Sequence, residues 1–176
     1  LHSFPTRRSS DLIEAKNKEI FEKYFLKLIE LKSFSEEKNA EVELLYGTTG
    51  YLYTLLFLKK YILSIEQTTD IKNIITKDIS KKLDETILRI FKLLLNSGIA
   101  YMEKYKWNKC LLFPFPINSK RPQFYLGAAH GLIGAIYMLL STIKFFPSLF
   151  NQEMSLNSKN IKISQLLLDN IKYIQS

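Results

Sequence analysis

Apolar residues recur every three or four positions along most of the chain, with polar residues between them. Three stretches have a Lys- and Glu-rich opposite face, which predicts amphipathic helices at 13–31, 74–102 and 161–174. Five prolines and six glycines leave little turn chemistry for a sheet of many strands. The pattern therefore favours an all-α fold.

Two further stretches are apolar on nearly every side, and each begins with a pair of glycines. A shift of 84 positions places Gly47 on Gly131 and Gly50 on Gly134, and the residues that follow also agree. Gly127 lies just ahead of the second pair. The spacing predicts two related helices, from Thr49 to about residue 63 and from the second motif to a point before Pro147. Glycine has no Cβ, so such helices can approach a neighbouring backbone closely.

The two copies differ at the position just before their first glycine. That position holds Tyr46 in one copy and His130 in the other, and His130 is the only histidine after the first twelve residues. Histidine can take up and release a proton near neutral pH, so His130 could transfer a proton in catalysis. The residues alone favour the alternative, a core histidine whose ring is satisfied by a backbone carbonyl.

The segments between these helices are predicted from composition. Residues 33–39, 64–70 and 151–160 are polar and predict loops, whereas three prolines make residues 106–124 irregular. Gly98 falls inside the long helix of residues 74–102, where glycine costs about 1 kcal/mol relative to alanine.

Charge and cysteine content narrow the classes of function. The formal net charge is +8, but the lysines are scattered among acidic residues, so we expect solvated helix faces and no nucleic-acid partner. The single cysteine, Cys110, excludes an internal disulfide and favours a reducing, cytoplasmic location. We interpret Cys110 as a small apolar residue, although nearby Lys109 could lower the pKa of a reactive thiol. Cys110 and His130 alone cannot form the usual zinc site, which needs three or four ligands.

Residues 125–143 carry no formal charge and are almost long enough to span a bilayer. The first glycine copy is interrupted by Lys59 and Lys60, so the repeat argues against a transmembrane helix. We expect no transmembrane segment, and peripheral contact with the plasma membrane stays open.

Residues 1–12 do not continue the helical pattern and resemble a translated sequencing adapter. We interpret residues 13–176 as a fragment of one helical domain that is truncated at both ends.

Two motifs give the chain a family resemblance. Residues 43–53, Glu-Leu-Leu-Tyr-Gly-Thr-Thr-Gly-Tyr-Leu-Tyr, and residues 125–134, Tyr-Leu-Gly-Ala-Ala-His-Gly-Leu-Ile-Gly, resemble the LanC-like proteins. These are eukaryotic relatives of the bacterial lanthionine synthetase cyclases. The resemblance implies an α/α toroid, in which an inner ring of glycine-led helices is paired with an outer ring of amphipathic ones.

The resemblance also implies an activity. Such an enzyme adds a zinc-activated thiol, from glutathione or a peptide cysteine, to dehydroamino acids in a peptide or protein substrate. His130 matches the active-site histidine of the family's Ala-His-Gly motif. The family's zinc ligands lie in later repeats that this chain does not match, Thr48 replaces a usual arginine, and Phe115-Pro116-Ile117 replaces a usual tryptophan. We therefore expect the fragment alone to be inactive. The alternative is a non-catalytic helical repeat that binds a peptide or protein.

Overall fold

The computed structural model describes residues 18–31, 41–45, 47–65, 77–117, 119–156 and 159–176. The predicted polar segment 33–39, most of the predicted loop 64–70 and the adapter-like residues 1–12 lie outside these ranges. So does Tyr46. Within the described ranges the chain is mainly helical, as predicted.

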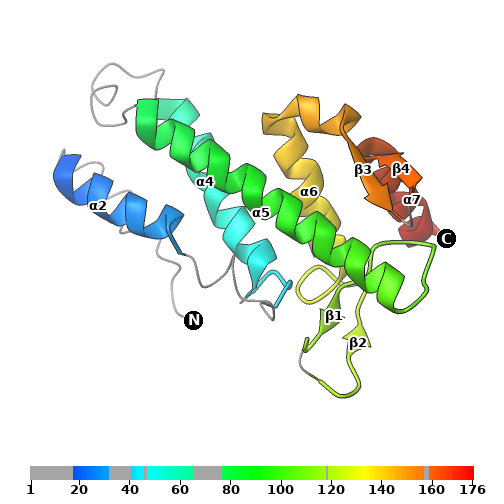
Figure 1. Ribbon diagram of the computed structural model, residues 1–176. Helices are drawn as coiled ribbons and strands as arrows, with labels where there is room; N and C mark the ends of the chain where they lie inside the picture. Colours follow the sequence, from blue (N-terminus) through cyan, green and yellow to red (C-terminus); the bar gives the residue numbers. More distant parts are fainter. Residues whose placement is uncertain (1–17, 32–40, 46, 66–76, 118, 157–158) are drawn as a thin grey trace.

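In the described part of the chain, five α-helices form the body of the fold (Figure 1). They are α2 (Lys18–Ile29), α4 (Thr48–Ile65), α5 (Lys77–Lys104), α6 (Leu132–Phe145) and α7 (Ile163–Gln175). The long helix α5 packs on both α4 and α6, and α7 packs on α6. The two glycine-led helices, α4 and α6, thus lie side by side with amphipathic helices packed against them. This is the inner and outer pairing expected of an α/α toroid.

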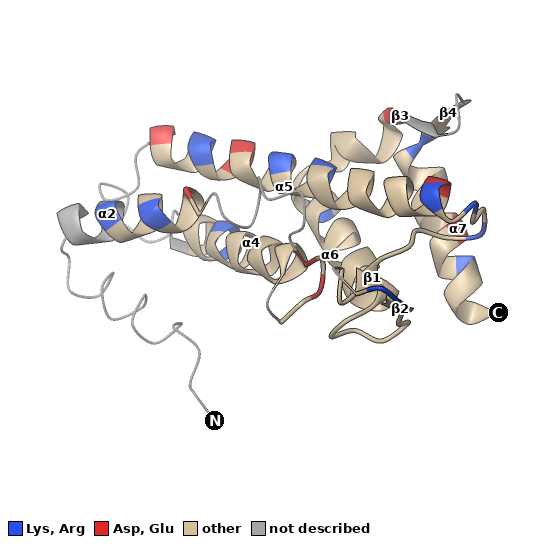
Figure 2. Ribbon diagram, turned by 60° about the horizontal axis from the view of Figure 1, so that its bottom comes forward, with Lys and Arg blue, Asp and Glu red and all other residues tan. Residues whose placement is uncertain are grey.

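The core lies where α5 meets the two glycine-led helices. Its fully buried side chains include Leu52 and Leu55 of α4, Phe91 and Leu94 of α5, and Leu139 of α6. Burial of one such side chain contributes about 1.5–3 kcal/mol, so this interface is a main source of stability. Polar positions of α5 face outward, and Figure 2 shows basic and acidic segments interspersed along it.

Two short antiparallel hairpins interrupt the helices. In the first, β1 (Pro114–Phe115) pairs with β2 (Gln123–Phe124) inside the segment predicted to be irregular. The second consists of β3 (Glu153–Leu156) and β4 (Lys159–Lys162), preceded by the 3₁₀ helix η1 (Pro147–Asn151). The prediction of a plain polar loop at 151–160 was therefore wrong. The backbones of the two strands pair with each other, for example at Met154 and Ile161. This pairing forms a hairpin although the mainly polar composition of the segment does not predict strands.

The predicted position of α4 and the predicted end of α6 agree with the structure, whereas α7 begins at Ile163 because Ile161 and Lys162 belong to β4. One glycine also has a different role from the predicted one. Helix α6 ends at Phe145, before Pro147, and the longer helix α4 contains the predicted 49–63. Gly98 was expected only to weaken its helix, but it also makes room for a neighbour, because a Cβ there would lie 2.8 Å from the ring of Phe113. The absent side chain lets the segment after α5 pack directly against the helix.

The uncharged stretch 125–143 is not one helix, since α6 begins only at Leu132. Among the described residues, no helix combines the length and apolar character that crossing a membrane requires.

Candidate active site

The two glycine motifs fold the same way. In each copy, a loop crosses the first turn of the helix and one of its carbonyls accepts the first helical N–H. Thr48 N–H donates to the Glu41 carbonyl at 2.8 Å, and Leu132 N–H donates to the Tyr125 carbonyl at 2.9 Å. Glu41 and Tyr125 are themselves 84 positions apart, so the repeat seen in the glycines extends to the backbone hydrogen bonds.

The same loops explain the glycines. A Cβ on Gly47 or Gly131 would lie 2.2 or 2.1 Å from the carbonyl oxygen six residues earlier. For Gly50 and Gly134 the corresponding distances are 2.1 and 2.0 Å. These contacts are with backbone, which cannot move aside as a flexible side chain can. The four glycines are therefore required for a close approach between the loop and its helix.

The two loops contact each other, and this contact creates the candidate site. Leu44 N–H donates to the Ala129 carbonyl at 2.8 Å, which holds the loops side by side. The neighbouring residues, Glu43 and His130, then meet through their side chains, with His130 Nδ1 3.0 Å from Glu43 Oε2. The same carboxylate oxygen accepts the Leu45 N–H at 2.8 Å. In Figure 2 an acidic segment accordingly lies at the entry to α4, beside β1 and β2.

The pair is buried at one end and open at the other. The Glu43 side chain is 1 % exposed, whereas that of His130 is 36 % exposed. The ring of Phe115 stacks on the imidazole, with centroids 4.5 Å apart and planes 15° from parallel. The hairpin that carries Phe115 is tied to the first loop, because the Glu41 carboxylate accepts the Ile117 N–H at 3.0 Å. His130 is thus held on one edge by Glu43 and on one face by Phe115.

This geometry assigns the proton on the imidazole. An ionised carboxylate only accepts hydrogen bonds, so Nδ1–H must be the donor to Glu43. In the neutral ring, Nε2 then carries the lone pair and can accept a proton from a bound molecule. A base oriented by a third group is the arrangement used in general acid–base catalysis. His130 is not the carbonyl-satisfied core histidine of the alternative interpretation, since its Nδ1 partner is a carboxylate and part of its ring is exposed.

Zinc does not fit the residues that the structure describes. Among them there is no group of three or more His, Cys, Asp or Glu side chains that could hold a metal ion. Cys110 is buried, and its Sγ accepts a hydrogen bond from Trp107 Nε1–H at 3.3 Å. Burial raises the pKa of this thiol, against smaller opposing effects of the Trp107 hydrogen bond and Lys109. Cys110 is therefore a packed thiol and not a nucleophile.

The sequence-predicted residues have different fates in the structure. Gly47, Gly50, Gly131 and Gly134 have the close contacts described above. Gly127 has none, since a Cβ there would meet no atom within 4 Å. Tyr46 lies outside the described residues. Sequence reasoning missed Glu43 as a functional residue, although its position in the apolar run Val42-Glu43-Leu44-Leu45 was a usable signal, because an unpaired carboxylate is rarely buried.

Comparison with protein-family models agrees with the glycine motifs. The model for the lanthionine synthetase C-like proteins matches residues 12–172. The chain belongs to the LanC-like family. A search of curated proteins and a search of solved structures each returned no match. Family membership accounts for the paired inner and outer helices.

Proposed function

We propose that this chain supplies the proton-transfer pair of a LanC-like enzyme that adds a thiol to a dehydroamino acid in a peptide. The observation that carries the proposal is the hydrogen bond between His130 and the buried Glu43. Glutathione or a peptide cysteine would be the thiol, and a peptide or protein with a dehydroalanine or dehydrobutyrine residue would be the acceptor.

The proposed reaction moves one proton from the thiol to the α-carbon of the dehydroamino acid, through His130. The thiol gives its proton to His130 Nε2, and its sulfur forms a bond to the β-carbon of the dehydroamino acid. The electron pair of the broken C=C bond then takes the proton from His130 at the α-carbon, which leaves a thioether and a neutral imidazole. Glu43 stabilises the transient imidazolium and fixes the orientation of its ring.

Zinc, which the family resemblance implies, would activate the thiol. The residues that the structure describes offer no site for it, and the steps above use only His130 and Glu43. This chain alone is expected to be inactive as a catalyst, because the glutathione thiol must ionise without help, so its effect is sought with the chain in excess over the peptide. At neutral pH glutathione is mainly thiol and can give its proton to His130, so the contribution of His130 can be measured there.

The stereochemistry at the α-carbon provides the test. Protonation creates a new stereocentre, and a fixed imidazole should deliver the proton to one face. The wild-type chain, glutathione and a peptide with one dehydroalanine should give an excess of one diastereomer. His130→Asn and Glu43→Gln should return the ratio found without protein. Equal ratios for wild type and His130→Asn would contradict the proposal and leave the non-catalytic peptide-binding module as the better interpretation.

A further inference from the structure

A pocket lies between the end of α5, the β1–β2 hairpin and α7. Its volume is about 330 Å³, and no residue of its described lining is charged. Six aromatic residues line it: Tyr105, Trp107, Phe113, Phe124, Tyr125 and Tyr173. This volume is at the lower end of the range of about 300–1,000 Å³ seen for ligand pockets, which suits one aromatic side chain better than a cofactor.

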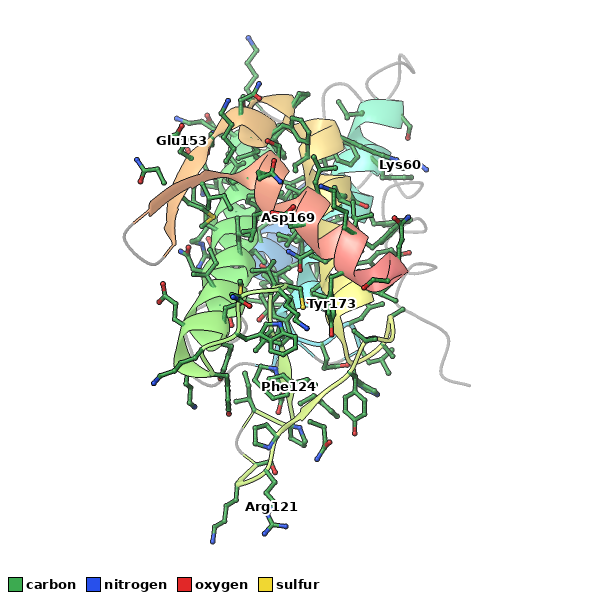
Figure 3. All side chains as sticks on the ribbon, turned by 90° about the vertical axis from the view of Figure 1, so that its right-hand side faces the viewer. Lys60, Arg121, Phe124, Glu153, Asp169 and Tyr173 are labelled. Atoms are coloured by element: carbon green, nitrogen blue, oxygen red, sulfur yellow. The ribbon has the colours of Figure 1, made fainter. Side chains whose placement is uncertain are left out.

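The aromatic lining is arranged as two edge-to-face pairs. Tyr105 and Phe124 have ring centroids 5.1 Å apart with planes at 80°, and Trp107 and Tyr173 have centroids 6.0 Å apart with planes at 88°. Figure 3 shows Phe124 and Tyr173 on the same side of the molecule. Edge-to-face contacts are the geometry that aromatic rings prefer with one another, so a further ring can extend the cluster.

One wall of the pocket is open to solvent. Tyr105 and Phe124 are each 41 % exposed, and Tyr125 and Leu126 are about half exposed. Such a group of exposed apolar side chains is typical of an interaction surface.

The rim carries positive charge. Lys104 Nζ lies 5.5 Å from the Tyr105 ring centroid, and Lys109 Nζ lies 5.4 Å from that of Trp107. The segment 103–109 adds one further lysine and a single acidic residue, Glu103. The charge therefore favours an acidic partner.

One lining residue of the pocket, Tyr125, contacts the ring that covers His130. The ring of Tyr125 lies 6.4 Å from that of Phe115, which stacks on His130. A chain anchored in the pocket could pass over Tyr125 and Phe115 to reach the imidazole.

We propose that this pocket anchors an aromatic side chain in an acidic segment of the peptide substrate, a few residues from the reacting dehydroamino acid. The proposal rests on the proposed function for the identity of the substrate. It adds a specificity site to the reaction. The second glycine motif contributes only Tyr125, Leu126 and Leu132 to this site, and the other lining residues come from elsewhere in the chain.

The fluorescence of Trp107 can report occupancy directly, since it is the only tryptophan of the chain. The probe is acetyl-Glu-Phe-Glu-amide, with acetyl-Glu-Ala-Glu-amide and acetyl-Lys-Phe-Lys-amide as matched peptides. We expect a saturable change in Trp107 emission with the first peptide, none with the alanine peptide, and at least about fivefold weaker binding of the lysine peptide at low salt. A missing response to the first peptide, or an equal response to the alanine peptide, would overturn the proposal.

Variants distinguish binding in this pocket from nonspecific binding to exposed apolar side chains. Phe124→Ala should weaken binding of the first peptide by about tenfold, whereas Phe150→Ala removes an equally exposed ring from η1 and should change nothing. Lys109→Gln should reduce the preference for the acidic peptide and keep the fold. Equal losses in the Phe124 and Phe150 variants would contradict the proposal. Equal affinity for 3-phenylpropionate would overturn it in favour of a small aromatic acid.

The assay contains no glutathione and no dehydroamino acid, so it does not depend on proton transfer by His130. Binding with no diastereomer excess would refute the proposed chemistry and keep the anchor. A diastereomer excess without binding of the aromatic peptide would support the proposed chemistry and refute the aromatic anchor.

Discussion

His130 Nδ1 lies 3.0 Å from Glu43 Oε2, although the two residues are 87 positions apart in the chain. The contact exists because two equivalent loops lie side by side and are joined by a backbone hydrogen bond from Leu44 to Ala129. Each loop is in turn held against its own helix by a pair of glycines. The two copies of the repeat therefore form a shared backbone scaffold. The candidate site includes His130, the position just before the first glycine at which the two copies differ.

The coupling between these two residues can be measured in a double-mutant cycle. Glu43→Gln and His130→Gln should each destabilise the chain, and the double variant should be more stable than the sum predicts, by about 1–2 kcal/mol. Denaturant unfolding gives the four free energies. A coupling energy near zero would show that the contact is not formed in solution.

Gly134→Ala should destabilise the protein by about 2–3 kcal/mol, because its Cβ would lie 2.0 Å from the Ala128 carbonyl oxygen. Helix propensity alone predicts the opposite sign, since alanine is favoured over glycine inside a helix by about 1 kcal/mol. Gly127→Ala is the matched control, and with no atom within 4 Å of its Cβ it should change stability by less than about 0.5 kcal/mol. Thermal or denaturant unfolding separates the two outcomes, and a stabilised Gly134→Ala variant would refute the steric explanation.

Tyr51 makes stability fall at alkaline pH. Its hydroxyl donates to the carbonyls of Leu28 and Ile29, both at 2.8 Å, and burial raises its pKa to about 12. Because the folded pKa exceeds the unfolded value of 10, the contribution of Tyr51 is complete below pH 10 and is lost as pH rises towards 12.

Tyr51→Phe tests this assignment. The variant should be less stable than wild type by about 1 kcal/mol at pH 7, because the carbonyls of Leu28 and Ile29 lose the hydroxyl that they share as donor. It should also lose less stability than wild type between pH 10 and 12. Parallel stability curves for the two proteins over that range would argue against the buried hydroxyl as their cause.

Cys110 should alkylate slowly in the folded protein. Burial raises its pKa above the ordinary value of 9, so the thiolate forms only at higher pH than in an unfolded chain. The rate of reaction with iodoacetamide, followed from pH 7 to 10 with and without denaturant, gives the comparison. A folded-state rate equal to the denatured one would mean that the thiol is accessible and that its surroundings differ from those described here.

The sequence alone determined the helices and the equivalence of the two glycine motifs. Helical periodicity and the need for a missing Cβ are local properties, so spacing within 10–30 residues was enough to predict α4, α5, α6 and α7. The comparison of the two copies also isolated His130, because a repeat shows which position departs from the shared frame.

The tertiary structure decided which other residues contact the two glycine motifs and the helices. Glu43 became the partner of His130, Gly98 became the contact point for Phe113, and the polar segment at 151–160 became a hairpin. None of these follows from periodicity. The Glu43–His130 contact depends on how loops 87 positions apart are placed against each other, and the other two depend on how the chain folds back on itself over shorter distances. A buried carboxylate needs a partner, but only the packed fold specifies that this partner is His130.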